Sequence, residues 1–187
     1  MGDPKRPRKK YNTPRHPWKA DQLSAELFLV GTYGLRNKHE LWRTQTLLSK
    51  IRKRARTLLA TKIEDPNSTR MLKEEEYFLS YLKRQGLIDS TAAIDDVLNL
   101  TIEEPLERRL QTVVWRKGIA TTAYQARQMI THRHIVSGNT IITIPGYMVK
   151  ANEDEKIVIR PGSTFPKQPV PSPSTTEEVS SPTTGEK

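Results

Sequence analysis

The sequence predicts an α+β protein with a mainly helical N-terminal lobe, a second domain of two short helices packed on a small, mostly antiparallel sheet, and a disordered C-terminal tail. Three observations support this prediction. Apolar residues recur with helical periodicity through most of the first 132 residues, and runs of β-branched residues flank the pair Gly138-Asn139. From Pro161 onward the chain is nearly all Pro, Ser, Thr, Gly and charged residues.

These patterns divide the chain into four parts. Residues 1–19 hold four prolines and seven cations, a composition that cannot build a core and predicts an extended basic arm. Residues 20–105 form the helical lobe and residues 106–160 form the second domain. Residues 161–187 form the tail, which has too little apolar surface to fold.

The helical lobe is expected to begin with two helices. Asp21 is a candidate N-cap for the first helix, which should end at Gly31 or Gly34. The second helix, roughly residues 38–60, has its apolar residues within one third of a helical wheel, so that side should pack. The opposite side is basic and carries Arg43, Lys50 and Arg54, with Lys53 beside them.

The middle of the chain is acidic and predicts two further helices. One, about residues 69–85, is closed by Gly86. A short helix should follow, with Val97, Leu98 and Leu100 buried.

Residues 105–132 predict the two short helices of the second domain. Pro105 suits the first turn of a helix over residues 105–117, in which Leu106, Leu110 and Val113 form the apolar stripe. Thr122 and Gln125 form a capping-box pattern that opens a helix over about residues 122–132. In this helix Ala123, Ala126 and Ile130 should face inward, whereas the outer side carries Tyr124, Arg127, Gln128 and Thr131.

A hairpin and a closing strand complete the second domain. The segments HIVS and TIITI are separated by the two-residue turn Gly138-Asn139. After Pro145-Gly146 the segment YMV should resume the strand, and KIVIR at residues 156–160 is the expected closing strand.

Charge is segregated along the chain, whose formal net charge is +10. Cations dominate in residues 1–20, 36–62 and 108–150, and the last of these segments holds seven Lys or Arg and no Asp or Glu in 43 residues. This pattern predicts a polyanionic partner, either nucleic acid or an acidic membrane surface. No apolar run reaches the roughly 20 residues that span a bilayer, and the N-terminus lacks a signal peptide's apolar segment, so a soluble, non-secreted protein without a membrane partner is expected.

The residues offer little for catalysis or metal binding. The absence of cysteine excludes disulfides, thiolate zinc sites and cysteine nucleophiles. There is no glycine-rich phosphate loop or nucleophile motif, so we expect no enzyme and no cofactor. His132 and His134 have no third ligand nearby in the sequence, which favours RNA contact or local hydrogen bonding over a metal site. Consecutive Glu74, Glu75 and Glu76 are expected to form a solvated helix face.

Residues 108–149 combine a basic helix, the segment Ala126-Arg127-Gln128, and a hairpin that ends in Ile144-Pro145. This stretch resembles the S-four RNA-binding domain, in which two short helices and a small sheet grip structured RNA. Two longer motifs, YGLRNKHELWR at residues 33–43 and LERRLQTVVWRKG at residues 106–118, resemble the archaeal and eukaryotic type of small-subunit ribosomal protein S-four. Arg133 stands where many relatives have Gly, and the N-terminal zinc cysteines of some bacterial relatives are missing.

The resemblance implies a structural component of the small ribosomal subunit in the cytoplasm. It implies binding of small-subunit ribosomal RNA at a multi-helix junction, a role in early subunit assembly with an influence on decoding accuracy left open, and ribosomal protein S-five as a neighbour. No homo-oligomer is expected. Two alternatives stay open, namely an assembly factor of the small-subunit precursor, as a nucleolar ribonucleoprotein component, and the targeting subunit of an RNA-modifying enzyme.

The candidate RNA-binding residues follow from the basic segments together with the resemblance. Closely spaced phosphates favour Arg and Lys and disfavour carboxylates on the same surface, which accounts for an acid-free segment. The acidic residues 89–104 would repel RNA and are therefore a candidate for protein contact. RNA contact by shape and 2′-hydroxyl groups adds polar side chains, and Tyr124 is available to stack on a base. The segment KRPRKK could instead be a nuclear localisation signal, although the RNA arm is favoured, and Trp18, Trp42 and Trp115 are expected to serve packing. The candidates are Lys5, Arg6, Arg8, Lys9, Lys10 and Arg15 in the arm; Arg36, Lys38, Arg43, Lys50, Lys53 and Arg54 in the helical lobe; and Arg108, Arg109, Arg116, Lys117, Tyr124, Arg127, Gln128, Thr131, His132, Arg133, His134 and Lys150 in the second domain.

Overall fold

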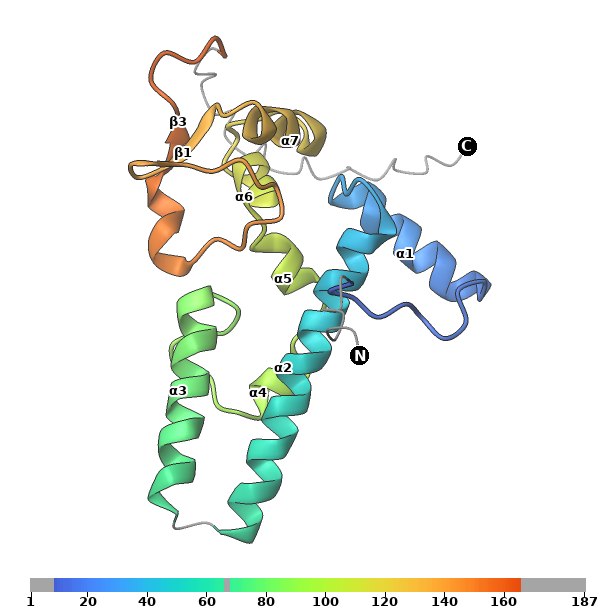
Figure 1. The fold of residues 1–187 in the computed structure, drawn as a ribbon, viewed down its shortest axis with the longest axis vertical. Helices are drawn as coiled ribbons and strands as arrows, with labels where there is room; N and C mark the ends of the chain where they lie inside the picture. Colours follow the sequence, from blue (N-terminus) through green and yellow to red (C-terminus); the bar gives the residue numbers. More distant parts are fainter. Residues whose placement is uncertain (1–8, 66–67, 166–187) are drawn as a thin grey trace, which may run out of the picture.

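A computed structural model describes residues 9–65 and 68–165 of the chain (Figure 1). Its elements, in chain order, are α1 (Ala20–Thr32), α2 (Lys38–Glu64), α3 (Thr69–Gln85), α4 (Asp96–Asn99), α5 (Glu103–Glu107), α6 (Leu110–Arg116), α7 (Ala123–Thr131), β1 (Ile135–Ser137), β2 (Thr140–Ile141), the 3-10 helix η1 (Ala151–Lys156) and β3 (Ile157–Ile159). Helices precede a small antiparallel sheet with strand order β2-β1-β3. The predicted α+β class is confirmed.

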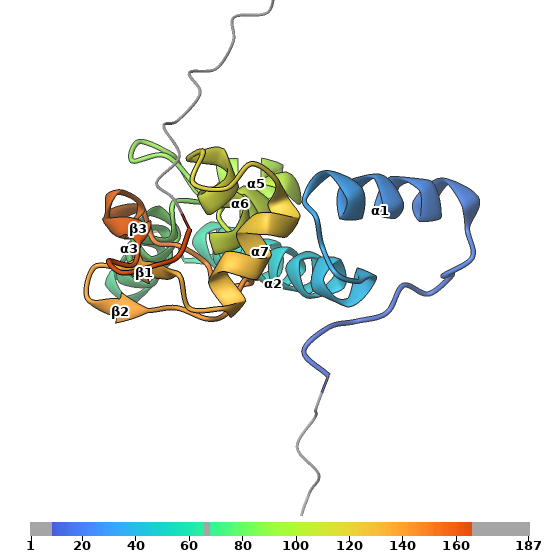
Figure 2. The same cartoon turned by 90° about the horizontal axis from the view of Figure 1, so that it is seen from above.

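Helices α2 and α3 form a long antiparallel hairpin that projects away from the sheet (Figure 1). The side chain of Asn37 caps α2 by accepting a hydrogen bond from the backbone N–H of Glu40 at 3.2 Å. The predicted apolar side of α2 is buried against α3 and α4. The buried residues form one cluster, which includes Leu48, Ile51, Ala55 and Leu58 of α2, Phe78 and Leu82 of α3, and Val97 and Leu100. The helix α1 lies on the far side of α2 from the sheet, as Figure 2 shows.

The arm that precedes α1 contains no helix or strand within residues 9–19. Tyr11 stacks on the ring of His39 at a centroid distance of 4.8 Å, and the N–H of Asn12 donates to Thr46 Oγ1 at 3.0 Å. The described part of the arm is therefore attached to α2. Lys5, Arg6 and Arg8 lie outside the described residues.

The prediction of a single helix over residues 105–117 is wrong, because the structure has two helices there, α5 and α6. Arg109 between them has an extended backbone, with φ −71° and ψ 138°. The neighbouring segment 145–149 provides the reason, since Leu110 N–H donates to Tyr147 O at 2.8 Å and Val149 N–H donates to Arg108 O at 2.9 Å. These bonds use backbone groups that a continuous helix would need. The segment YMV accordingly makes one bridge, between Arg109 and Met148, instead of the strand predicted for it.

The hairpin of the second domain has the predicted two-residue turn. Val136 pairs with Ile141 and Ser137 with Thr140, so Gly138 and Asn139 form the turn, and Gly138 has the positive φ of 59° that such a turn requires. The strand β3 pairs with the other edge of β1. Helices α6 and α7 pack with the sheet in a second cluster, which contains Leu110, Val114, Ala126, Met129, Ile130, Ile135, Val149 and Ile157.

Residues 161–165, which the predicted tail includes, contact the second domain. The ring of Phe165 lies edge-on to that of His134 at 4.8 Å, and Ser163 Oγ lies 2.9 Å from His134 Nδ1. The rest of the predicted tail, residues 166–187, lies outside the described residues.

The predicted boundary between the helical lobe and the second domain, at residue 105, falls inside α5. Leu106 of this helix packs with Tyr33, Leu35 and Leu41 of the helical lobe. The division of the chain into four parts stays a prediction.

Candidate nucleic-acid interface

A carboxylate of the helical lobe binds two guanidinium groups of the second domain. Glu40, in the first turn of α2, accepts from Arg109 Nη2 at 2.9 Å and from Arg127 Nη2 at 2.6 Å. Arg127 Nη1 donates to the second Glu40 oxygen at 3.1 Å and to Gln111 Oε1 at 3.2 Å. Arg109 and Arg127 lie 69 and 87 positions after Glu40 in the sequence, so the cluster joins distant parts of the chain.

The ion-pair cluster is largely withdrawn from water. The side chains of Arg109, Glu40 and Arg127 are 9%, 16% and 22% exposed. Burial by itself raises the pKa of Glu40, but the hydrogen bond from Arg127 and the charges of Arg109 and Arg127 outweigh it, so the pKa lies below its ordinary value. Burial lowers the pKa of Arg109, and the charge of Glu40 opposes that effect. Glu40 is therefore ionised at neutral pH.

The backbones of the helical lobe and the second domain also approach closely at this junction, where Gln111 binds both. Gln111 is fully buried, and its Nε2 donates to Gly34 O at 2.8 Å and to Ala123 O at 3.0 Å. Gly34 has a φ of +58°, and a Cβ atom added there would lie 2.7 Å from Cβ of Ala123. Glycine is needed at this position for both reasons, since neither the backbone conformation nor the space accepts a side chain.

Arg127 was expected to project outward, and this expectation is wrong. Its side chain turns to Glu40 across the junction, and Arg109 is buried beside it. A helical wheel places residues only relative to their own helix, so it could not show that the helical lobe lies against this side of α7. Glu40 itself was missed, although it is the one acid among nine cations in residues 36–62. That isolation is the signal that could have identified it.

Most other cations of the acid-free segment also have acidic partners from outside it. Arg108 pairs with Asp154 at 2.7 Å, Arg116 with Glu107 at 2.8 Å, and Lys150 with Glu153 at 3.2 Å. Lys117 donates to the backbone carbonyl of Asp154. Five of the seven cations thus form ion pairs with carboxylates at positions 40, 107, 153 and 154. The local positive charge is smaller than the sequence of this segment alone suggests.

An open cleft of about 280 Å³ lies where α2 meets the segment 144–148. Arg43, Arg109 and Arg127 line it together with Glu40, so three arginines and one carboxylate share the cleft. The remaining wall is formed by Ile144, Pro145, Gly146 and Met148, with Thr44, Leu47 and Pro105 from the helical lobe. The excess of positive charge, with an exposed Arg43 at the rim, suits a phosphate group.

Exposed polar residues follow the outer side of α7. Tyr124 is 62% exposed, and Gln128, Thr131, His132 and Arg133 are also exposed. Arg133 has a φ of +65°, the left-handed conformation that glycine adopts more readily than other residues. His134 is half-buried beside Ser163 and Phe165. Within the described residues no group of three potential metal-ligating side chains occurs.

The helical lobe presents its candidate cations on the surface. Arg36, Arg43, Lys50, Lys53 and Arg54 are exposed, as are Lys9, Lys10 and Arg15 of the arm. Lys38 is partly covered and pairs with Glu26 at 3.3 Å. No helix in residues 9–65 or 68–165 is long and apolar enough to cross a membrane.

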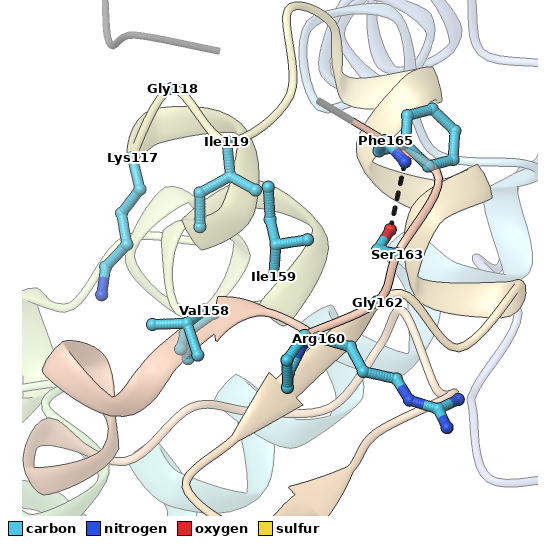
Figure 3. A pocket seen from close by; sticks show the side chains of 11 residues that line it. Lys117, Gly118, Ile119, Val158, Ile159, Arg160, Gly162, Ser163 and Phe165 are labelled. Carbon is cyan, nitrogen blue, oxygen red and sulfur yellow. Dashed lines mark hydrogen bonds between the residues drawn. The ribbon is translucent and has the colours of Figure 1, made fainter. Parts of the chain in front are cut away.

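A second groove, of about 770 Å³, lies beside β3 and has a different character (Figure 3). Figure 3 shows Ile119, Val158, Ile159 and Phe165 around it, with Lys117 and Arg160 at its margins. Its aliphatic walls do not suit phosphate groups, so it does not extend the charged site.

Comparison with known proteins agrees with this architecture. The S4 domain family matches residues 108–154. The chain is 50% identical over 168 residues to the small ribosomal subunit protein uS4 of Hyperthermus butylicus, covering 90% of this chain and 93% of that protein. It is 47% identical to uS4 of Ignicoccus hospitalis, with coverage of 90% and 98%, and 45% identical to uS4 of Saccharolobus solfataricus, with coverage of 90% and 91%. With this identity over nearly the whole of each chain, the protein belongs to the uS4 family of small ribosomal subunit proteins.

Proposed function

We propose that this protein is a structural component of the small ribosomal subunit that binds ribosomal RNA across the junction of its two lobes. The uS4 relatives match 90% of the chain, including both the helical lobe and the S4 domain. Neither of the alternatives, an assembly factor or a targeting subunit, has a specific observation in its favour.

The observation that carries the proposal is the position of Arg43. It lines the cleft at the junction together with Arg109 and Arg127, and it also belongs to the basic side of α2. On a wheel of 100° per residue, Arg43, Lys50 and Arg54 lie within about 40° of one another. The basic side of α2 therefore begins at the cleft and continues along the helix, so two basic segments of the sequence contribute to one surface.

The chemistry of this surface suits structured RNA. Guanidinium groups bind phosphate oxygens in pairs, and a bound phosphate would reduce the repulsion among the three arginines of the cleft. Gln128, Thr131 and His132 supply neutral groups for 2′-hydroxyl contacts, and the exposed ring of Tyr124 can stack on a base. The ion pairs of Arg109 and Arg127 with Glu40 support a second role for these two residues, which is to orient the lobes.

Family membership supports the finer parts of the proposal. We infer that the RNA site is a multi-helix junction, that binding occurs early in subunit assembly, and that the assembled subunit functions in the cytoplasm. The acidic residues 89–104 repel RNA and include the exposed carboxylates Asp89, Asp95 and Asp96, so this segment is proposed to contact a neighbouring protein. Ribosomal protein S-five is the candidate neighbour.

Two experiments test the proposal. In cell extracts the protein should co-sediment with mature small subunits, and its confinement to precursor particles would favour an assembly factor instead. In filter binding with small-subunit ribosomal RNA, Arg43→Glu should lower the affinity by at least about tenfold, since it reverses a charge at the phosphate site. Lys156→Glu is the matched control, because it reverses an exposed charge on η1 outside this surface. Equal losses in both variants would count against a defined site.

A further inference from the structure

Helix α3 carries an exposed stripe of cations and tyrosines that the fold does not use. Arg70, Lys73, Tyr77, Tyr81 and Arg84 are spaced by three or four residues, and on a wheel of 100° per residue they fall within about 80°. The side chain of Arg70 is 86% exposed, and Tyr77 and Tyr81 are 64% and 37% exposed. Packing of α3 depends instead on its opposite flank, where Phe78 and Leu82 are buried.

Acidic residues of α3 are mostly absent from this stripe. Glu74 lies at its border and pairs with Arg70 at 3.2 Å, which leaves an excess of positive charge. Glu75 points to the other flank, where it binds Lys62 at 3.0 Å, and Glu76 lies about 100° away from Tyr77 as its neighbour in sequence. Although the middle of the chain is acidic overall, one side of α3 is therefore cationic and aromatic.

The stripe is continuous with the basic side of α2. The guanidinium of Arg54 lies over the ring of Phe78, 5.2 Å from its centroid, and so covers the seam between the two helices. On a helical wheel, Arg54 lies about 80° from the centre of the buried stripe of α2, and Tyr81 lies about 80° from that of α3, in the same rotational sense. Because the two helices run antiparallel and face each other, equal rotations in the same sense turn both residues to the same side of the pair. Figure 1 shows α3 beside the C-terminal part of α2, with the two helices diverging toward α5. One side of the hairpin thus joins Lys50 and Arg54 to the α3 stripe.

We propose that the α3 stripe is an additional RNA-binding surface, which binds phosphates through Arg70, Lys73 and Arg84 and stacks unpaired bases on Tyr77 and Tyr81. This inference rests on the proposed function, since the RNA is the same small-subunit RNA that reaches the α2 surface. Alternating cations and aromatic rings suit single-stranded or looped RNA, because each base offers a face for stacking while its phosphate is neutralised. Arg84 already lies 6.0 Å from the Tyr81 ring centroid, and this cation–π contact orients the ring at the surface.

The test compares two exposed aromatic sites in filter binding with small-subunit ribosomal RNA. Tyr77→Ala/Tyr81→Ala should weaken binding by about tenfold for each base that stacks. The urea melt should shift only slightly, because Tyr77 is mostly exposed and Tyr81 is partly exposed. Phe28→Ala, which removes a ring that is 71% exposed on α1, should bind as the wild type does. Arg70→Ala/Arg84→Ala should reduce the slope of log affinity against log salt by about 1.5, the sum for two lost phosphate contacts. Ultraviolet crosslinking of the wild-type complex should attach RNA to the peptide that contains Tyr77 and Tyr81.

The outcomes separate this inference from the proposed function. If the tyrosine variant binds like the wild type while Arg43→Glu still weakens binding, the α3 surface is not an RNA site and the inference fails alone. If the wild type itself shows no salt-dependent binding, the proposed function fails and the inference with it. If the tyrosine variant binds naked RNA normally but does not enter reconstituted subunits, the stripe contacts a protein, and the inference is overturned.

Discussion

The guanidinium of Arg127 and the carboxylate of Glu40 lie 2.6 Å apart, although 87 positions separate them in the sequence. Together with Arg109, they connect the start of α2 to α7 and to the break between α5 and α6. The ion-pair cluster positions two basic segments as one surface, and its energetics can be measured separately from RNA binding.

Glu40→Gln should destabilise the protein substantially. The substitution leaves two guanidinium groups close together and poorly solvated, so we expect a loss of about 3 kcal/mol in the free energy of unfolding, at the lower end for a buried pair because some exposure remains. Urea melts at neutral pH measure this. Glu74→Gln is the control, since it breaks an exposed pair with Arg70 and should change stability by less than about 0.5 kcal/mol. Equal effects would contradict a structural role for the cluster.

Arg127→Glu should lower both stability and RNA affinity. It places two carboxylates together at the junction, which is unfavourable whether or not RNA is present. The charge-swapped variant Glu40→Arg/Arg127→Glu should recover part of the lost stability, because it restores an opposite pair, and a double-mutant cycle in urea gives the coupling energy. A coupling energy near zero would show that the pair does not hold the lobes together.

Stability should fall at acidic pH, and Glu40 should be one cause. Its pKa lies below the ordinary value of 4.5 in the folded protein, so the unfolded state binds the proton more readily. The contribution is fully present above pH 4.5 and is lost as the pH falls through the folded-state pKa. Urea melts of the wild type and of Glu40→Gln between about pH 6 and pH 3 should therefore converge as the pH decreases. A constant difference between them over this range would exclude the linkage.

Ile130→Ala should reduce stability without a direct effect on RNA. Ile130 is fully buried among α6, α7 and β1, so its truncation leaves a cavity that costs about 2–5 kcal/mol. Filter binding under conditions where the variant remains folded should match the wild type. Gln128→Ala on the exposed side of the same helix should show the opposite pattern, with normal melts and weaker binding.

Much of the fold and part of the site could be predicted from local patterns. The spacing of apolar residues predicted α2 and α3, the Gly138-Asn139 pair predicted the hairpin, and Gly86 predicted the end of α3, where it adopts φ +68°. These features depend on contacts between near neighbours or on the conformational preference of one residue. The basic side of α2 was predicted from the periodicity of that helix in the same way, and Arg43, Lys50 and Arg54 are exposed in the structure.

The sequence by itself determined the order of the elements, the segregation of charge and membership of the uS4 family. Only the tertiary structure decided which cations are free and which are paired. Arg109 and Arg127 bind Glu40, Arg108 binds Asp154, and residues 105–117 break into two helices because segment 145–149 takes backbone hydrogen bonds from them. Each of these outcomes depends on groups that are distant in the chain and meet when the lobes and loops pack. Periodicity along the sequence holds no information about such partners, because it describes each element only in relation to itself.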